Sequence, residues 1–212
     1  MNCVNILDYG CGNILSLKRA IIELGFDVKF CSDEKTLIKS NYLILPGVGA
    51  FENAMNLLKK RNLVDALKEY CLIKKKPILG ICLGMQLLLT KSYEMGEHLG
   101  LDLIKGKNVL IKTDIRNIKF KVPHIDWEEV RMYNNTLSKN SILKNLNGKS
   151  FYFVHSYMAS LENLDNLIAL CQYHDVKIPA IIQSDNIIGC QFHPEKSGIN
   201  GLNLLKNAFT IL

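Results

Sequence analysis

The sequence predicts a three-layer α/β fold in which helices cover both faces of a central, mostly parallel sheet. Short, strongly apolar stretches alternate with stretches of helical periodicity from the N-terminus to about residue 90. Such apolar stretches are typical of strands buried on both faces, and their alternation with helices is typical of parallel sheets. The stretches end in glycine-containing turns at residues 10–12, 46–47 and 80–84. Ligands bind such sheets at the carboxyl ends of the strands, where these turns lie.

The sequence also predicts where the strands and helices lie and which residues end or cap some of them. Gly25 is expected to end the first helix, and Asp33 to cap the second. From about residue 103 the pattern becomes β-rich and irregular. The apolar pattern predicts strands at 4–7, 27–31, 42–45, 77–81, 151–154 and 187–192, and helices at 15–24, 34–38, 51–59, 63–72, 85–89 and 201–209.

Cys82 lies between two glycines, Gly80 and Gly84, where the fourth strand meets a helix. This is the pattern of a nucleophile elbow, G-x-nucleophile-x-G, with sulfur in place of the usual serine oxygen. Only a thiolate attacks a carbonyl carbon well, and a helix N-terminus favours the thiolate. The alternative is that Cys82 is a small buried apolar residue in a tight turn.

A partner for the thiol is predicted near the other end of the chain. His193 and Glu195 follow an apolar strand and are separated by Pro194. Because proline holds the preceding residue out of the helical region, the tripeptide is expected to be extended, with His193 and Glu195 on the same side. A carboxylate on one imidazole nitrogen would leave the other nitrogen free as a base. Taken alone, the pair could equally be surface residues after a strand.

Composition limits the class of protein. The 212 residues are 48% hydrophobic and 22% charged, as expected of one globular domain spanning residues 1–212. No apolar stretch approaches the ~20 residues of a membrane span, and no signal peptide is apparent. Seven cysteines without a C-x-x-C pair argue against disulfides or structural zinc and favour the reducing cytoplasm. The net charge of +6 is scattered, with little aromatic interleaving, which argues against nucleic-acid binding.

These features resemble the class I, triad-type glutamine amidotransferases, whose fold is flavodoxin-like. The resemblance is carried by Pro46 to Phe51, Gly80 to Gln86 and His193 to Glu195, blocks that together span most of the chain. It implies that Cys82 attacks the side-chain amide of L-glutamine, that His193 is the general base and acid, and that Glu195 orients His193. It further implies an oxyanion hole at Gly47, Val48, Gly49 and Leu83, glutamine binding by Gln86, Ser156 and Tyr157, and no metal or organic cofactor.

Within that family the sequence most resembles the glutaminase subunits of imidazole glycerol phosphate synthases, which serve histidine biosynthesis. The blocks Asp8 to Asn13, Val122 to Ile125, Phe153 to Tyr157 and Gln191 to Gly198 carry this resemblance. It implies a heterodimer with a (β/α)₈ barrel cyclase subunit, to which ammonia is channelled. A barrel of that kind needs about 250 residues, so it would be a separate chain. By resemblance, Asn13, Pro123, Trp127 and Lys196 lie at the contact.

One loop departs from the family pattern, in which Pro-His-x-Gly-Trp is usual. Residues 123–127 read Pro-His-Ile-Asp-Trp, so Asp126 replaces a glycine and adds a charge. A related subunit that supplies ammonia for amidination of surface sugars is therefore an alternative. Two further alternatives are a cysteine peptidase of related fold and a non-catalytic flavodoxin-like module. The peptidases usually place a histidine directly after the cysteine, where this chain has Leu83.

Overall fold

The computed structural model describes residues 3–112, 114–115, 118–133 and 142–211 of the 212-residue chain. The strands are β1 (Cys3–Leu7), β2 (Asp27–Cys31), β3 (Leu43–Leu45), β4 (Ile78–Ile81), β5 (Leu89–Ser92), β6 (His98–Leu99), β7 (Ile104–Leu110), β8 (Asp114–Ile115), β9 (Ile118–Lys119), β10 (His124–Met132), β11 (Lys149–His155), β12 (Tyr157–Leu161), β13 (Leu167–Tyr173), β14 (Val176–Ser184) and β15 (Ile187–Cys190). The α-helices are α1 (Ile14–Glu23), α2 (Glu34–Lys39), α3 (Phe51–Lys60), α4 (Leu63–Lys68), α5 (Leu83–Leu87) and α6 (Gly198–Ile211). A π-helical turn η1 (Glu69–Ile73) continues α4, and η2 (Leu164–Asn166) and η3 (Pro194–Lys196) are 3₁₀ turns.

A large mixed sheet forms the centre of the molecule. Its strand order is β11-β10-β13-β14-β15-β4-β3-β1-β2. The five strands from β15 to β2 are parallel, whereas the strands from β15 to β11 pair antiparallel. The predicted α/β class is confirmed, although the sheet is more evenly mixed than the sequence indicates. A smaller sheet, ordered β12-β7-β5-β6, packs beside it, and β8 pairs with β9.

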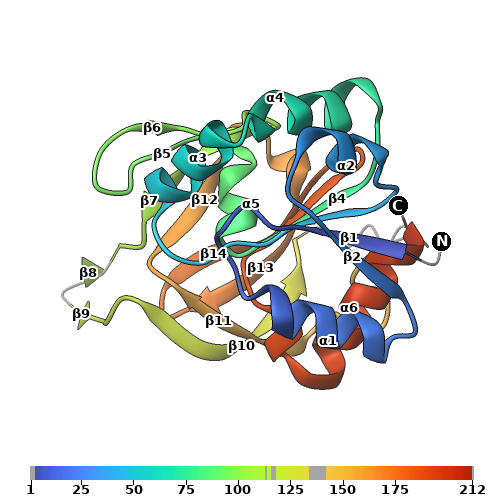
Figure 1. The fold of residues 1–212 in the computed structure, drawn as a ribbon. Helices are drawn as coiled ribbons and strands as arrows, with labels where there is room; N and C mark the ends of the chain where they lie inside the picture. Colours follow the sequence, from blue (N-terminus) through green and yellow to red (C-terminus); the bar gives the residue numbers. More distant parts are fainter. Residues whose placement is uncertain (1–2, 113, 116–117, 134–141, 212) are drawn as a thin grey trace.

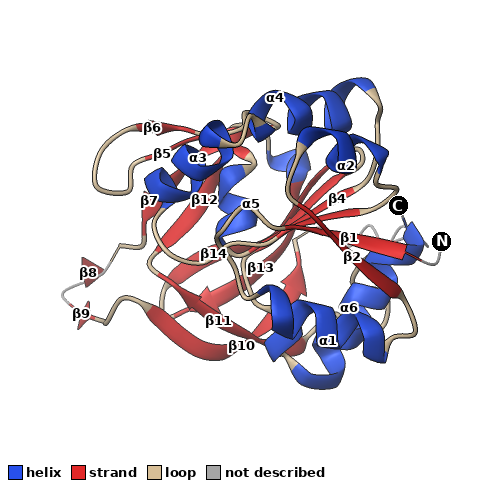
Figure 2. Cartoon of the chain, in the orientation of Figure 1, coloured by secondary structure: helices blue, strands red, loops and turns tan. Residues whose placement is uncertain are grey.

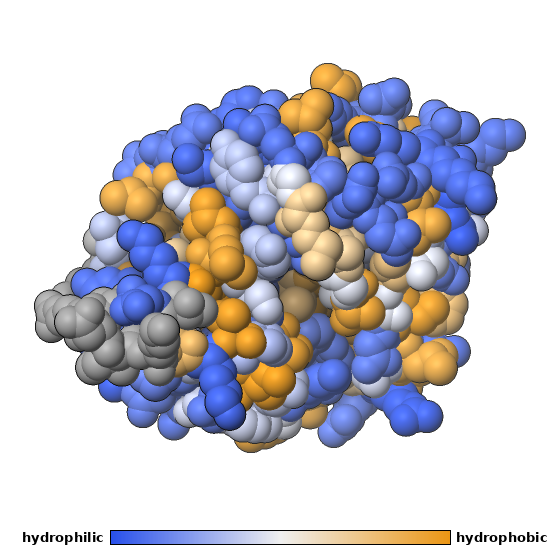
Figure 3. Space-filling model, turned by 90° about the vertical axis from the view of Figure 1, so that its left-hand side faces the viewer, coloured by the Kyte–Doolittle hydropathy of each residue, from blue (hydrophilic) through white to orange (hydrophobic). Residues whose placement is uncertain are grey.

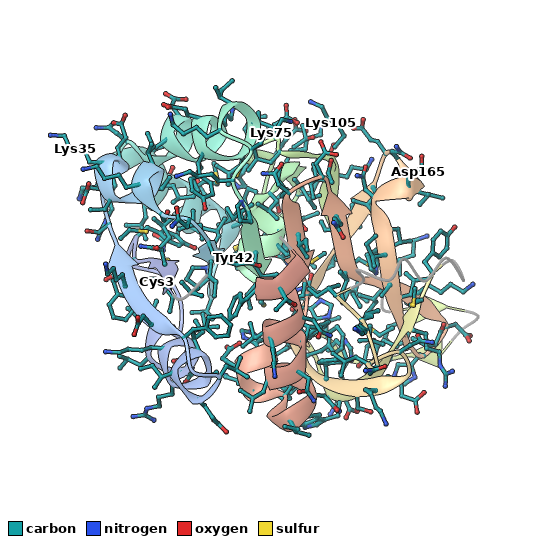
Figure 4. All side chains as sticks on the ribbon, turned by 90° about the vertical axis from the view of Figure 1, so that its right-hand side faces the viewer. Cys3, Lys35, Tyr42, Lys75, Lys105 and Asp165 are labelled. Atoms are coloured by element: carbon teal, nitrogen blue, oxygen red, sulfur yellow. The ribbon has the colours of Figure 1, made fainter. Side chains whose placement is uncertain are left out.

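Helices cover both faces of the parallel half, which gives the three layers (Figures 1 and 2). Helices α1 and α6 lie together on one face and share a core with the inward side chains of β1, β3 and β4. Helices α2, α3 and α4 bury their apolar faces against the other side. Figure 4 shows Tyr42 inside the molecule, where its ring meets Phe209 of α6 at 4.9 Å, while Lys35, Lys75 and Asp165 point outward.

Local signals account for the first four strands and the helices between them. The Asp33 carboxylate accepts a hydrogen bond from the Thr36 backbone N–H at 3.0 Å and so caps α2 as predicted. Gly25 follows α1 with φ +83°, a conformation that glycine adopts without strain. No helix in the described part of the chain is both long enough and apolar enough to cross a membrane.

The helix predicted at 85–89 is wrong at its C-terminal end. Helix α5 stops at Leu87, and Leu89 begins β5. The cause is tertiary, because the Leu101 N–H donates to the Leu87 carbonyl, and the Leu103 N–H donates to the Leu88 carbonyl, each at 2.9 Å. Carbonyls that would continue a helix are thus used to pair with a distant segment.

The parallel strands end at one edge of the sheet. Gly10 follows β1, Gly47 follows β3, Cys82 follows β4, and His193 lies three residues after β15. Because β4 lies between β3 and β15 in the sheet, the segments that follow these three strands are brought side by side. The fold therefore gathers residues 111 positions apart in the sequence at one edge.

Candidate active site

The turn that carries Cys82 is strained and tightly packed. Cys82 has φ 52° and ψ −110°, a region that L-residues occupy at a cost of about 1–3 kcal/mol. A Cβ atom on Gly84 would lie 1.8 Å from the Leu45 carbonyl oxygen, and one on Gly80 would lie 2.8 Å from the Gly84 carbonyl oxygen. Both glycines of the predicted elbow are therefore required by close backbone approach.

Cys82, His193 and Glu195 meet at this edge. The His193 Nδ1 atom lies 2.8 Å from Glu195 Oε1, and both side chains are almost fully buried. Burial by itself would lower the pKa of His193, but hydrogen bonds with Cys82 and Glu195 outweigh it and raise the pKa to about 10. Because Nδ1 is held by the carboxylate, the other ring nitrogen is the one left for the sulfur. The arrangement can share one proton between sulfur and imidazole.

The backbone after His193 differs from the extended tripeptide that the sequence predicts. His193 is extended, with φ −100° and ψ 96°, as the following proline requires. Pro194, however, begins the 3₁₀ turn η3, in which the Lys196 N–H donates to the His193 carbonyl at 3.0 Å. Proline suits the first position of such a turn because its φ is already set and it needs no donor there. Glu195 thus reaches His193 from the turn rather than from a strand.

A cavity of about 550 Å³ opens beside the cysteine and histidine. Most of the residues assigned by resemblance lie on its walls. Its lining includes Cys82 and His193, Val48, Gly49 and Leu83 from the proposed oxyanion hole, Gln86, Ser156 and Tyr157 from the proposed glutamine site, and Pro123 and Lys196 from the proposed partner contact. Glu195, Gly47, Asn13 and Trp127 are not among its lining residues.

Gly47 lies behind the cavity wall. A Cβ atom there would lie 2.9 Å from Leu83 Cβ and 3.0 Å from the Tyr9 hydroxyl oxygen, so the position packs β3 against the elbow. Gly49 has φ +96° and open space around it. Leu83 is the first residue of α5, where backbone N–H groups have no partner within the helix. Val48, Gly49 and Leu83 are therefore the better placed of the four proposed oxyanion-hole residues.

Gln86 is fixed by hydrogen bonds across the cavity floor. Its backbone N–H donates to the Cys82 carbonyl at 3.2 Å, which confirms the predicted helical turn between them. Its side-chain Nε2 donates to the Tyr157 carbonyl at 3.1 Å. These contacts tie α5 to the start of β12, which brings Ser156 and Tyr157 to the cavity.

A carboxylate that the sequence did not indicate also lines the cavity. Glu94 lies in the loop between β5 and β6, and its Oε2 accepts a hydrogen bond from the Phe51 backbone N–H at 2.7 Å. This contact holds Glu94 at the N-terminus of α3. A carboxylate so placed suits the ammonium group of an amino-acid substrate. No local pattern marked Glu94, because its position depends on the pairing of β5 with β6.

Two buried histidines lie next to the cavity and were also missed. His124 Nδ1 lies 3.1 Å from His155 Nε2, and His155 Nδ1 lies 2.8 Å from the Tyr157 carbonyl oxygen. Since a carbonyl only accepts, His155 carries its proton on Nδ1, and His124 donates to its Nε2. Burial is the main cause that lowers the pKa of His155 to about 3 and that of His124 to about 4. Both imidazoles are therefore neutral at pH 7.

We expect the histidine pair to make the fold sensitive to acid. Because both pKa values are lower in the folded chain, the unfolded chain binds more protons below about pH 6.5. With these two pKa values, the free energy of unfolding should fall by about 5 kcal/mol as the pH drops from 7 to 4.5. In His124→Gln this fall should be smaller, as measured by urea unfolding across that range. A pH dependence identical to that of wild type would contradict the expectation.

Of the four residues proposed for the partner contact, Pro123 and Lys196 line the cavity, whereas Asn13 and Trp127 do not. Trp127 is half exposed on β10, and its ring lies 6.0 Å from that of Tyr152. Lys196 Nζ lies 5.8 Å from the same Tyr152 ring, so these side chains form one cluster. Asn13 lies apart from the cavity lining, where its Oδ1 accepts from the Ser16 N–H and caps α1.

All seven cysteines are free thiols. Within residues 3–112, 114–115, 118–133 and 142–211, no group of three or more His, Cys, Asp or Glu side chains is placed to hold a metal ion.

Comparisons with known proteins give the family. The model of the class-I glutamine amidotransferases matches residues 5–212. The chain is 44% identical over 206 residues to the imidazole glycerol phosphate synthase subunit HisH of Lactococcus lactis subsp. lactis, covering 97% of each chain. It is 43% identical to the subunit of the same name from Caldanaerobacter subterraneus subsp. tengcongensis, covering 96% of each.

A solved structure shows the same fold. The PurLQS structure from Thermotoga maritima superposes with a TM-score of 0.72 at 16% identity, covering 99% of this chain and 98% of that one. At that identity the likeness concerns the fold alone. With the family model matching nearly the whole length and relatives above 40% identity, this chain belongs to the class I glutamine amidotransferase family.

Proposed function

We propose that this chain is the glutaminase subunit of an imidazole glycerol phosphate synthase. The observation that carries the proposal is the meeting of Cys82 and His193 on the wall of one cavity, with Glu195 on the far side of the imidazole. The names of the relatives that match along nearly the whole chain support the choice of synthase. The substrate is L-glutamine, and the products of this subunit are glutamate and ammonia.

The geometry supports a two-step mechanism. The Cys82 thiolate attacks the side-chain amide carbon of glutamine, and backbone N–H groups near Val48, Gly49 and Leu83 receive the oxyanion. His193 protonates the leaving ammonia, and a thioester forms on Cys82. Water, deprotonated by His193, then releases glutamate. Glu195 holds the imidazole in place throughout, as its 2.8 Å contact with Nδ1 requires.

An exposed apolar surface around the cavity mouth supports docking of a partner subunit. Val48, Met95 and Leu110 line the cavity and are exposed, Met95 to 92%. Ile125 and Trp127 continue this apolar character along β10. Figure 3, which views the molecule from the side of β7 and β8, shows apolar side chains gathered over the middle of that face. Surfaces of this kind mark interaction sites, and we assign this one to a (β/α)₈ barrel cyclase that receives the ammonia.

The departure at Asp126 is accommodated locally. The Asp126 Oδ1 accepts a hydrogen bond from the Trp127 backbone N–H at 2.7 Å, and the residue pairs with Phe153 across β10 and β11. The extra carboxylate is exposed and does not disturb the strand. We therefore favour the histidine-pathway partner over an enzyme that amidinates surface sugars. The seven free thiols suit a reducing compartment, and we place the protein in the cytoplasm.

The test pairs the chain with the cyclase subunit from the same organism. Glutamate release by the purified chain should be slow and should rise at least about tenfold when the cyclase and its nucleotide substrate are added, as coupled sites commonly show. Imidazole glycerol phosphate should form from glutamine in the same mixture. A complex that hydrolyses glutamine no faster than the free chain and makes no imidazole product would overturn the choice of partner.

A further inference from the structure

A buried amide lies directly against the sulfur of Cys82. Gln191 follows β15, two residues before His193, and its side chain is fully buried. Its Nε2 atom lies 3.8 Å from Cys82 Sγ, within the range of an N–H···S hydrogen bond. A fully buried amide costs free energy unless its hydrogen bonds are made, so this contact forms part of what satisfies Gln191.

The orientation of that amide is fixed by a chain that starts at a backbone carbonyl. The Tyr157 carbonyl can only accept, so the Gln86 atom 3.1 Å from it is the amide nitrogen. The same nitrogen lies 3.2 Å from one end of the Gln191 side-chain amide. That end is the oxygen, Oε1, because it faces a hydrogen-bond donor. The NH₂ group of Gln191 is therefore the end that faces the sulfur. His155 Nδ1 also donates to the Tyr157 carbonyl at 2.8 Å, and this second bond holds the start of the chain in place.

We propose that Gln191 donates a hydrogen bond to the Cys82 thiolate and that Gln86 sets the orientation of its amide. The inference rests on the proposed role of Cys82 as nucleophile. An amide N–H is a neutral donor at every working pH, and its bond to sulfur is stronger when the sulfur is charged. Gln191 thus favours the thiolate in addition to His193, and its contact helps to fix the position of the sulfur that glutamine must meet. Gln86 acts through Gln191 here and is a positioning residue.

The experiment measures the reactivity of Cys82 without glutamine. Iodoacetamide alkylation of Cys82 is followed against pH, with the site identified by peptide mass spectrometry. Gln191→Met keeps the length of the side chain and removes the donor. We expect the midpoint of the alkylation profile to rise by about one pH unit and the rate at pH 7 to fall about tenfold, as for loss of a hydrogen bond to a charged group. In the assembled complex kcat should fall similarly, with KM changed by less than about threefold.

Two further variants keep the inference open to refutation. Gln183→Met, on β14, is the matched control and should keep the wild-type profile, because its Nε2 donates to the Asp185 carbonyl at 3.1 Å and does not reach the cavity. Gln86→Met removes the group that orients Gln191, so the midpoint should rise although Gln191 is present; it carries the test if Gln191→Met does not fold.

An unchanged profile in a folded Gln191→Met, or in Gln86→Met if that variant must serve, would overturn the inference while leaving the proposed function intact. Glutamine turnover by Cys82→Ala would instead remove the proposed function itself, so the two failures are distinguishable.

Discussion

Cys82→Ala is expected to lower glutamine hydrolysis by at least about 10⁴-fold, because no other thiol can form the thioester. Among the described cysteines, only Cys82 lines the cavity that His193 lines. The substitution keeps the backbone demand at this position, since alanine and cysteine carry the same Cβ at φ 52°. The measurement is steady-state glutamate release by the variant in complex with the cyclase, with circular dichroism to show that the fold is kept.

The matched control for this loss is Cys190→Ala. Cys190 is the last residue of β15 and precedes His193 by three residues. It is fully buried, and its thiol donates to the Phe192 carbonyl at 3.6 Å. Burial is the main cause that raises its pKa, so it is a neutral, unreactive thiol. This variant should keep hydrolysis within about threefold of wild type, allowing for a small cavity. If Cys82→Ala retained more than a hundredth of wild-type turnover, another nucleophile would have to be sought.

Local chemistry explains why the first half of the fold could be predicted. The strands β1, β3 and β4 are short, mainly apolar runs, and the turns near them use residues with a defined conformational role, such as Asp33 and Gly25. The nucleophile elbow could be predicted from the sequence because close backbone packing at positions 80 and 84 requires glycine. His193 and Glu195 were paired from an expected extended tripeptide, but in the structure they meet through the 3₁₀ turn that Pro194 begins, so the pairing was right and its backbone was wrong.

The rest depended on contacts between distant segments. The antiparallel half of the sheet joins β10 to β13, a pairing across nearly 40 residues that no local pattern specifies. Helix α5 ends where its last carbonyl groups accept hydrogen bonds from the backbone N–H groups of Leu101 and Leu103. Gln191 begins a block that carries the family resemblance, but no role could be assigned to it from the sequence, since an amide becomes a donor to sulfur only when the fold aligns it.

Gly84→Ala is expected to be among the most damaging small substitutions for the fold. Its Cβ would lie 1.8 Å from the Leu45 carbonyl oxygen and 2.8 Å from the Leu45 carbonyl carbon, both of which belong to the backbone of β3. Neither can rotate away, so β3 and the elbow must separate. We expect a loss of about 3 kcal/mol in the free energy of unfolding and a Tm lower by about 6–12 °C. Thermal unfolding followed by circular dichroism measures both.

Whether Gly84→Ala lowers or raises the free energy of unfolding shows whether packing or helix propensity decides the outcome at this position. Gly84 lies in α5 with ordinary helical geometry, so alanine should gain up to about 1 kcal/mol there if only helix propensity mattered. Gly148→Ala is the opposite case, because that residue has φ +76° and nothing within 4 Å of an added Cβ, and its cost should be about 1 kcal/mol of backbone strain. A Gly84→Ala chain as stable as Gly148→Ala would mean that β3 and the elbow can part without cost. Because Cys82 lies two residues away on the same turn, the separation should also move the sulfur away from His193, so hydrolysis should fall even at temperatures where the variant remains folded.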